Sequence, residues 1–143
     1  MSPVPIQQSA AALDLSPRLF ASETVAGSPA LAAETVVCSV TCDGDIAVVQ
    51  GIYVWGFAAF TVGTDGASVL ARIRRDSVSG TIIAATGAVN EGVTAATQLA
   101  TRIVFGRDEA PTMPGEVYVL TLTVASATAA STVSGASLFA LAV

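Results

Sequence analysis

The stretch IAVVQGIYVWGFAAFTVGTDG, residues 46 to 66, decides how the rest of this sequence is interpreted. Residues 46–64 carry no charge, and their number is close to the roughly 20 residues of a membrane-spanning helix. However, a glutamine and several glycines interrupt the stretch, and its flanking charges are aspartates, whereas Lys and Arg orient membrane helices. Bulky and small residues alternate, as they do in strands. We therefore predict two strands, 46–54 and 55–62, and no membrane partner.

Similar short runs, rich in β-branched residues and divided by Gly, Pro, Asp and Ser, fill most of the remaining sequence. The predicted strands are 19–25, 34–42, 46–54, 55–62, 67–75, 80–86, 96–105, 116–125 and 131–142. No segment shows a sustained helical stripe with a cap and a glycine stop. Eight to nine such strands predict an all-β fold, a two-sheet antiparallel sandwich of the jelly-roll kind. An immunoglobulin-like sandwich is the nearest alternative.

Turn signals separate the predicted strands. We predict hairpin turns at 63–66 (GTDG), at 76–80 (DSVSG) and at 126–131 (SATAAS), and a longer loop at 107–116. In the longer loop, Gly115 permits a positive φ.

The beginning of the chain has a different composition. Three of the six prolines lie within residues 1–18, among Ser, Gln and Ala. We therefore predict an extended arm over residues 1–18 and a sandwich domain over residues 19–143. An arm of this kind lies along a neighbour or remains disordered. Its candidate interface residues are Pro3, Pro5, Ile6, Leu13 and Leu15.

The chain has few charges for its size. Charged residues make up 12% of the 143 residues, about half of the roughly 25% typical of a soluble domain, and mean hydropathy is +0.69. Such a surface leaves apolar patches that favour association, so we expect a protein that assembles. The net charge of −5 argues against nucleic acid as a partner.

The arginine-rich segment RIRR, residues 72–75, is the one basic cluster. Strand alternation places Arg72 and Arg74 on one face, and Ile73 and Arg75 on the other. We interpret it as a solvated or interface strand, with a phosphate-binding patch as the lesser alternative.

Residues for catalysis are scarce. Without histidine no Ser-His-Asp or Cys-His pair can form, and without lysine no Schiff base can form. We expect no enzyme, no cofactor and no metal. A calcium turn at DGD, residues 43–45, and a glycosidase acid pair using Asp108 and Glu109 are lesser alternatives.

The two cysteines, Cys38 and Cys42, are four residues apart in a predicted strand. That spacing separates them by about 13 Å, too far for a disulfide unless the strand turns near residues 43–45. We interpret both as reduced packing residues.

An aromatic group lies inside the opening stretch. Tyr53, Trp55 and Phe57 share one strand parity and therefore one face. We interpret them as sheet core or subunit contact and treat them as interface candidates. The alternative is a sugar-binding platform formed with Asp108 and Glu109 in loops at one end of the sandwich.

Two segments carry a resemblance to a known class of proteins. The runs AGSPALAAETVVCSV…DIAVVQGIYVWGFAAFTVGTDGASVLARIRR and PGEVYVLTLTV…ASTVSGASLFAL resemble the jelly-roll decoration, or cement, proteins of tailed bacteriophages, over roughly residues 24–142. The shared features are glycine-punctuated strands rich in Thr, Val and Ala, the lack of Lys and His, and a preceding arm.

The resemblance implies a structural role. Decoration proteins form homotrimers, bind the major capsid protein on the outer capsid surface and stabilise the shell without chemistry. It therefore implies a virion protein made in the host cytoplasm, with itself and the major capsid protein as partners. Two alternatives remain: a virion fibre or spike head that binds host glycans, and a shell-forming coat subunit.

Overall fold

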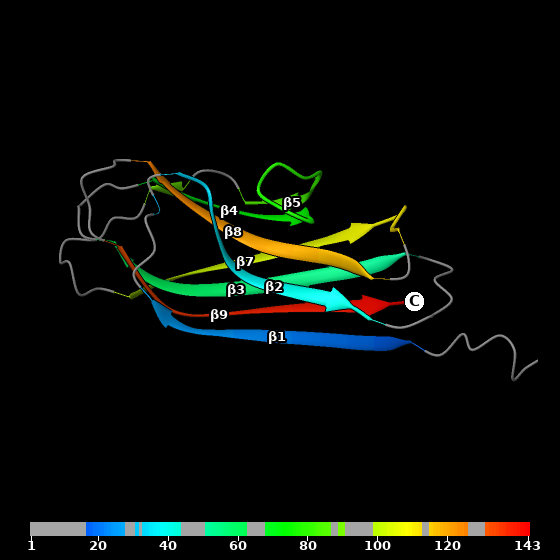
Figure 1. The fold of residues 1–143 in the computed structure, drawn as a ribbon. Coiled ribbons are helices and arrows are strands. Elements are labelled where there is room, and N and C mark those ends of the chain that lie inside the picture. The colour runs from blue at the N-terminus through cyan, green and yellow to red at the C-terminus, as the bar shows by residue number, and fades with distance from the viewer. Residues whose placement is uncertain are drawn as a thin grey trace, which may run out of the picture.

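The computed structural model is a sandwich of two antiparallel sheets (Figure 1). It describes residues 17–27, 31, 33–43, 51–62, 68–86, 89–90, 99–112, 115–125 and 131–143. The four-stranded sheet contains, in spatial order, β1 (Arg18–Gly27), β9 (Ser131–Ala142), β3 (Ile52–Val62) and β7 (Leu99–Asp108). The five-stranded sheet contains β2 (Thr35–Cys42), β8 (Glu116–Ala125), β4 (Ser68–Arg75) and β5 (Ile82–Ala85), and β6 (Val89–Asn90) also pairs with β4.

The order of the strands identifies the topology. The chain changes sheet at every connection between strands except those that link β4, β5 and β6. The result is two interleaved sheets with the orders β1-β9-β3-β7 and β2-β8-β4-β5, which is the jelly-roll arrangement. The predicted fold class is therefore confirmed, and the immunoglobulin-like alternative is wrong.

The predicted turns had mixed outcomes. The hairpin at residues 76–80 is confirmed, because β4 and β5 pair and Asp76 takes a positive φ of 64° in the turn. The hairpins predicted at 63–66 and 126–131 are wrong, because the strands on either side of each lie in different sheets. Turn residues indicate that the chain reverses direction, but they do not indicate which sheet receives the next strand.

The opening stretch also differs from its prediction. Residues 52–62 form one continuous strand, β3, where we predicted a boundary between residues 54 and 55. Gly56 does not interrupt it, because it faces Leu138 and Leu120 at a crowded point where a Cβ would lie 2.9 Å from the Ser137 carbonyl oxygen. Within the described part of the chain, we find no helix long and apolar enough to cross a membrane.

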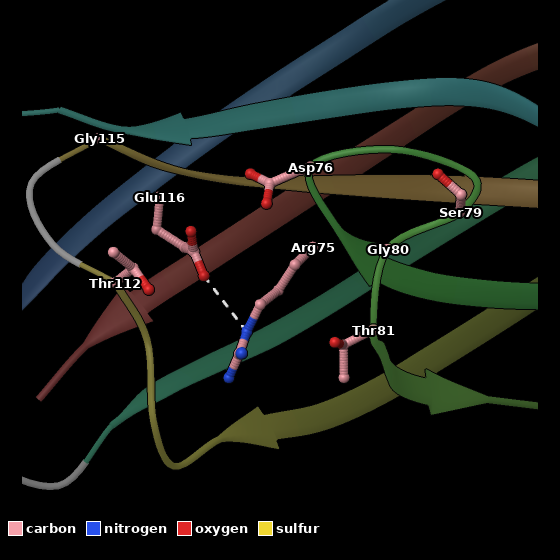
Figure 2. Close-up of a pocket in the computed structure, with 8 residues that line it drawn as sticks. All are labelled: Arg75, Asp76, Ser79, Gly80, Thr81, Thr112, Gly115 and Glu116. Carbon is pink, nitrogen blue, oxygen red and sulfur yellow. Dashed lines mark ion pairs between the residues drawn. The ribbon is translucent and has the colours of Figure 1, made fainter.

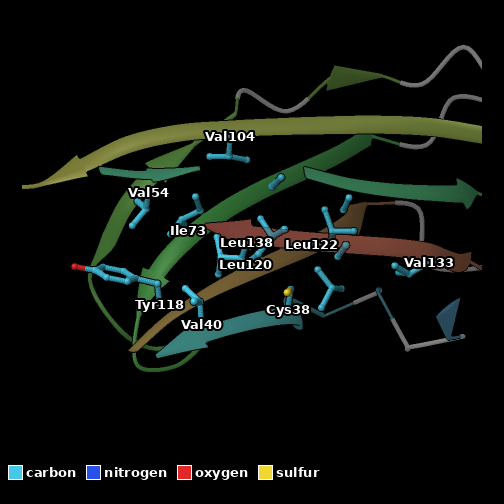
Figure 3. Packing of buried hydrophobic residues seen from close by; sticks show 14 of the residues in the cluster. Cys38, Val40, Val54, Ile73, Val104, Tyr118, Leu120, Leu122, Val133 and Leu138 are labelled. Carbon is cyan, nitrogen blue, oxygen red and sulfur yellow. The ribbon is translucent and has the colours of Figure 1, made fainter. Parts of the chain in front are cut away.

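The core fills the space between the two sheets (Figure 3). Alternate residues of each strand face inward, as the pattern in β4 shows with buried Val69, Ala71 and Ile73. The largest fully buried side chains include Tyr118, Phe60, Leu31, Ile52, Leu120, Leu122 and Leu138. Burying each of the large aliphatic side chains stabilises the fold by about 1.5–3 kcal/mol.

A close approach between the sheets occurs along β7. A Cβ on Gly106 would lie 2.7 Å from the Cβ of Ala84 in β5, so only glycine fits at this point. The contact brings β5 of one sheet next to β7 of the other.

The first strand begins next to the predicted arm. Its first residue is Arg18, one residue before the predicted start of the sandwich. The predicted arm contacts Pro3, Pro5, Ile6, Leu13 and Leu15 lie outside the described residues.

Candidate functional site: the outer face of the four-stranded sheet

The outer face of the four-stranded sheet is apolar. The register aligns its outward residues in rows across the four strands, so that Trp55 lies between Phe105 of β7 and Phe139 of β9. We call this surface the apolar face; it comprises Leu19, Ala21, Tyr53, Trp55, Phe57, Ile103, Phe105, Phe139 and Leu141. Among them Ile103 is 72% exposed, Phe105 65%, Leu19 58% and Phe57 42%.

This concentration distinguishes the apolar face from the rest of the described surface. The other exposed large hydrophobic residues are Val36, Val78 and Ile82, which belong to the five-stranded sheet or the turn between β4 and β5. Single exposed apolar residues are normal, whereas a contiguous group marks an interaction site. The apolar face is therefore the candidate functional site.

Ring contacts hold the aromatic side chains in place. Tyr53 stacks on Phe105 with ring centroids 6.1 Å apart, and Trp55 stacks on Phe139 at 5.5 Å. The guanidinium of Arg107 lies 5.5 Å from the centre of the Tyr53 ring. Side chains already held in one rotamer lose little entropy on binding, so the face is suited to a stable contact.

The apolar face has a recess and two marginal charges. A hollow of about 280 Å³ opens on it, lined by Glu23, Thr24, Phe57, Ala59, Ser134, Gly135, Ala136 and Ser137. Glu23 lies on the edge strand β1, and Arg107 lies two rows away on the opposite edge strand, β7, where it also pairs with Glu109 at 3.6 Å. Carboxylate and guanidinium thus lie at diagonally opposite corners of the face.

The sequence predicted the contribution of one strand, β3, to the apolar face. The prediction that Tyr53, Trp55 and Phe57 share a face is confirmed, and that face is the outer one. The sequence did not select Ile103 and Phe105 of β7, although their alternation in TRIVF was visible. That alternation does not reveal which face is covered, so it could not identify the contribution of β7 by itself.

The outer face of the five-stranded sheet carries a cluster of paired charges. Glu34 accepts hydrogen bonds from Arg74 Nε at 2.7 Å, from Arg74 Nη2 at 2.9 Å and from Arg72 Nη1 at 3.2 Å. Thr121 donates its hydroxyl to the same carboxylate at 2.7 Å. We call this group the Glu34 cluster. The hydrogen bond from Arg74 is the main cause that lowers the pKa of Glu34, and it outweighs the effect of burial.

The outcome for RIRR follows from this cluster. The predicted alternation is confirmed, because Arg72 and Arg74 lie on the outer face while Ile73 is buried. The outward arginines are partly exposed and paired with Glu34, and the interpretation as a solvated or interface strand stays a prediction.

A second charged group, the Asp108 cluster, joins the two sheets at one end. Arg75 at the end of β4 donates two hydrogen bonds to the carboxylate of Asp108, which is almost fully buried at the end of β7. The hydroxyl of Tyr118 donates to Asp108 at 2.8 Å, and the backbone of Ala110 donates at 3.1 Å. Burial raises the pKa of Asp108, but these hydrogen bonds prevail and hold it below its usual value.

This arrangement overturns part of the glycan hypothesis. Asp108 is committed to Arg75 and Tyr118 inside the protein, so it cannot bind a sugar beside Trp55. Tyr53 and Trp55 lie within a strand and not in loops at one end.

Beside the Asp108 cluster is an open pocket of about 510 Å³ (Figure 2). Its lining is polar and consists of Arg75, Asp76, Ser79, Gly80, Thr81, Thr112, Gly115 and Glu116. Gly115 has the positive φ, 86°, that the sequence predicted. Glu116 forms an ion pair with Arg75 Nε at 3.2 Å, but its Oε1 receives no hydrogen bond. Burial raises the pKa of Glu116.

The two cysteines and the possible metal ligands add no further site in the described part of the chain. Cys38 and Cys42 are both buried and not bonded to each other, as the sequence predicted. Burial raises the pKa of the Cys42 thiol to about 12, so it stays neutral and unreactive. Among the residues that the structure describes, no three His, Cys, Asp or Glu residues gather as metal ligands would. Asp43 is described, but the rest of the DGD turn is not.

Comparison with known proteins gives a fold and no family. No family model matches the chain, and no curated protein matches its sequence. Among solved structures, VP2 in a subviral particle of infectious bursal disease virus is similar, with a TM-score of 0.54 and 15% identity over 88% of this chain. A chain of the infectious bursal disease virus Gx strain is similar with a TM-score of 0.51 and 17% identity over 90% of this chain.

These structural similarities cover only part of the viral chains. The chain spans about a third of the length of both viral chains, 33% and 32%. A xylan-binding module, CBM15, is similar over 84% of this chain and 90% of its own, but its TM-score of 0.42 and 11% identity carry no argument. At these identities the likeness shows the jelly-roll fold alone.

Proposed function

We propose that this chain is a structural subunit of a virus particle, which acts by burying its apolar face against other subunits. In its specific form, the proposal is a homotrimeric decoration protein that binds the major capsid protein on the outside of a phage capsid and stabilises the shell. It acts through complementary surface and performs no catalysis.

One observation carries the proposal. Ile103, Phe105 and Leu19 are more than half exposed on a face whose other members are also mostly apolar. Apolar surface stabilises a protein by about 25 cal/mol for each Å² removed from water, so covering this face favours assembly. The jelly-roll fold that the chain shares with VP2 of a subviral particle is compatible with such a role.

The ion clusters support a role without chemistry. Glu34 and Asp108, the carboxylates with lowered pKa values, are held by arginines and hydroxyls of the same chain. Groups that are already paired in this way stabilise the sandwich, whereas a catalytic acid or base needs access to a substrate.

Analytical ultracentrifugation of the full chain tests the assembly. We expect a trimer for the wild-type chain and a folded monomer for Ile103→Glu, because a charge at this position cannot be buried against a neighbour. Val78→Glu is the matched control, since Val78 is 41% exposed but lies in the turn after β4. A wild-type chain that remains monomeric at high concentration would refute the proposal.

Cosedimentation with undecorated phage capsids tests the decoration role. We expect the full chain to bind and the chain without residues 1–18 to stay folded but fail to bind. Equal binding by both chains would show that the arm is not the capsid contact.

A second candidate is glycan binding by the apolar face. The rings of Tyr53, which stacks on Phe105, and of Trp55, which stacks on Phe139, favour it, because flat aromatic surfaces pack against sugar rings. Glycan-array binding that is lost in Trp55→Ala, by a chain that does not self-associate, would support this candidate over the first.

A further inference from the structure

The polar pocket beside the Asp108 cluster holds a buried carboxylate that the chain satisfies only in part. The Glu116 side chain lines this pocket and is 5% exposed, and its Oε1 accepts no hydrogen bond. The backbone N–H of Thr112 donates a hydrogen bond to the same carboxylate, so it is the other oxygen that is occupied. A buried acceptor without a donor is unfavourable, and in a pocket it marks a place where a ligand can supply the donor.

The neighbouring arginine does not supply this donor. Arg75 Nε lies 3.2 Å from Glu116 Oε1, as the dashed line in Figure 2 shows. However, Nε and Nη2 of Arg75 direct their hydrogen bonds to Asp108, and Nη2 also donates to a backbone carbonyl. Because Asp108 balances the charge of Arg75, the carboxylates of Glu116 and Asp76 leave the pocket with an excess of negative charge. The charge of Asp76 accordingly helps to raise the pKa of Glu116.

Hydrogen bonds within the chain fix the walls of the polar pocket. On one side, the backbone N–H of Asp76 donates to the Val117 carbonyl at 2.9 Å. On the other side, the backbone N–H of Gly115 donates to the Cys42 carbonyl at 3.1 Å. Walls that are already in place lose little entropy when a ligand binds. The lining also offers three hydroxyl groups, those of Ser79, Thr81 and Thr112.

We propose that the polar pocket binds a primary ammonium group, supplied by a lysine side chain of a partner protein. An ammonium has three donors and no acceptor, which matches a lining of carboxylate and hydroxyl oxygens. A guanidinium fits less well, because its fork needs both oxygens of a carboxylate and one oxygen of Glu116 is bonded to Thr112. The chain contains no lysine, so the partner is a different protein and not a second copy.

The lining of the pocket argues against two other classes of ligand. None of the described residues that line it is aromatic, so a sugar ring finds no flat surface on which to stack. A calcium ion takes six to eight oxygen ligands, and two carboxylates beside a guanidinium are a poor match for it. In the described part of the chain, no three acidic residues gather there as metal ligands would.

The choice of a protein as the source of the ammonium rests on the proposed function, in which the chain acts through contacts with other proteins. The ammonium site itself does not depend on that function. None of its lining residues belongs to the apolar face, so the site adds a separate contact.

NMR titration of the full chain with a blocked tripeptide that has a central lysine tests the site. At about 150 mM salt, which screens non-specific attraction, we expect saturable shifts of the Gly80 and Gly115 amide signals, with a dissociation constant of roughly millimolar order. The same peptide with an acetylated lysine is the matched control, because acetylation removes the charge. Equal shifts with the two peptides would overturn the proposal.

Two substitutions test the carboxylates. Glu116→Gln keeps the shape of the side chain and should weaken peptide binding by about tenfold, since hydrogen bonds to charged groups are the stronger ones. Asp76→Asn should weaken it by about threefold, because Asp76 is exposed, and asparagine tolerates the positive φ of 64° at this position. Glu109→Gln removes an equal charge outside the lining and should bind as the wild type does. Wild-type affinity in a folded Glu116→Gln variant would overturn the site.

Two further ligands test the chemistry and the source of the ammonium. A blocked tripeptide with a central arginine should bind more weakly than the lysine peptide, and tighter binding would overturn the choice of an ammonium. n-Butylammonium should bind no more tightly than the lysine peptide. Tighter binding of this free amine would overturn the protein source.

The failure of this inference can be separated from failure of the proposed function. A chain that self-associates but does not distinguish the lysine peptide from its acetylated form refutes the ammonium site alone. A chain that binds the lysine peptide but sediments as a monomer refutes the assembly through the apolar face and leaves the ammonium site in place.

Discussion

The two sheets of this sandwich present opposite outer faces. On the five-stranded sheet, Glu34 accepts hydrogen bonds from Arg72, Arg74 and Thr121, so the charges of this cluster are paired within the chain. On the four-stranded sheet, Ile103 and Phe105 project from a face of aromatic and aliphatic residues that nothing in the described chain covers. One face carries charges that are paired within the chain, and the other exposes large apolar side chains.

This difference explains how a chain with so few charges can fold and, under the proposed function, also assemble. The paired arginines and carboxylates are concentrated at the Glu34 and Asp108 clusters, where hydrogen bonds orient them. Those groups therefore contribute to the stability of the subunit and leave the apolar face with charge only at its margins. Substitutions on the apolar face should therefore mainly affect association, and substitutions in the Glu34 cluster should mainly affect folding stability.

The largest effect should come from truncation on the apolar face. Phe105→Ala removes a 65% exposed ring, so folding should change by less than about 1 kcal/mol, the worth of its stacking on Tyr53. Association should weaken by about 2 kcal/mol or more, roughly 30-fold, if the ring is buried at the centre of a contact. Sedimentation equilibrium and urea unfolding measure the two quantities separately. Loss of folding stability with unchanged association would reverse the roles assigned to the two faces.

The next effect should appear on the opposite face. Glu34→Gln leaves Arg72 and Arg74 without their carboxylate. We expect the free energy of unfolding to fall by about 2 kcal/mol. Hydrogen bonds to charged groups contribute about 1.5–3 kcal/mol, and the partial exposure of this cluster reduces that contribution. Under the proposed function, self-association should be unchanged. Glu109→Gln is the control, because the Glu109 side chain is 78% exposed. The free energy of unfolding of this variant should equal that of the wild type within about 0.5 kcal/mol.

The sequence predicted the alternation within strands of both faces, but not the partners that other strands supply. Alternation in RIRR correctly separated Arg72 and Arg74 from Ile73, and alternation around Trp55 correctly grouped the aromatic residues. Both are local properties of a strand, set by the period of two. The partner Glu34 is 38 residues from Arg72, and only the strand order brings them together.

The same limit applies to the connections. Turn composition located most of the places where strands end, but the turns after β3 and β8 were assigned to hairpins because sequence-adjacent strands usually pair. Which sheet receives the next strand depends on packing of the whole core, and no short window contains that information. For the same reason, Ile103 and Phe105 were not identified as part of the site, although they lie beside Phe57 and Trp55.

Acid should weaken the polar face and leave the apolar face unchanged. The pKa of Glu34 is lower in the folded chain than in the unfolded chain, so its contribution is present at pH above the ordinary value of 4.5 and is lost as the pH falls through the folded value. The stability difference between wild type and Glu34→Gln should therefore shrink between pH 6 and pH 3. Urea unfolding at each pH measures it. A difference that stays constant with pH would mean that the carboxylate charge does not hold the cluster together.

The smallest effect should come from Glu116, where the pairing of charges is least complete. Arg75 directs its hydrogen bonds to Asp108, so the buried Oε1 of Glu116 has the ion pair at 3.2 Å but no donor. Burial raises the pKa of Glu116 in the folded chain, so its ionised form is unfavourable there, and this penalty applies as the pH rises through the folded value. Glu116→Gln, which keeps the shape and removes the charge, should stabilise the chain by up to about 1 kcal/mol at pH 7. The gain should vanish near pH 3, where the wild-type carboxyl is protonated in both states. If Glu116→Gln were instead as destabilising as Glu34→Gln at pH 7, the ion pair with Arg75 would outweigh the burial of charge, and the two carboxylates would be equivalent.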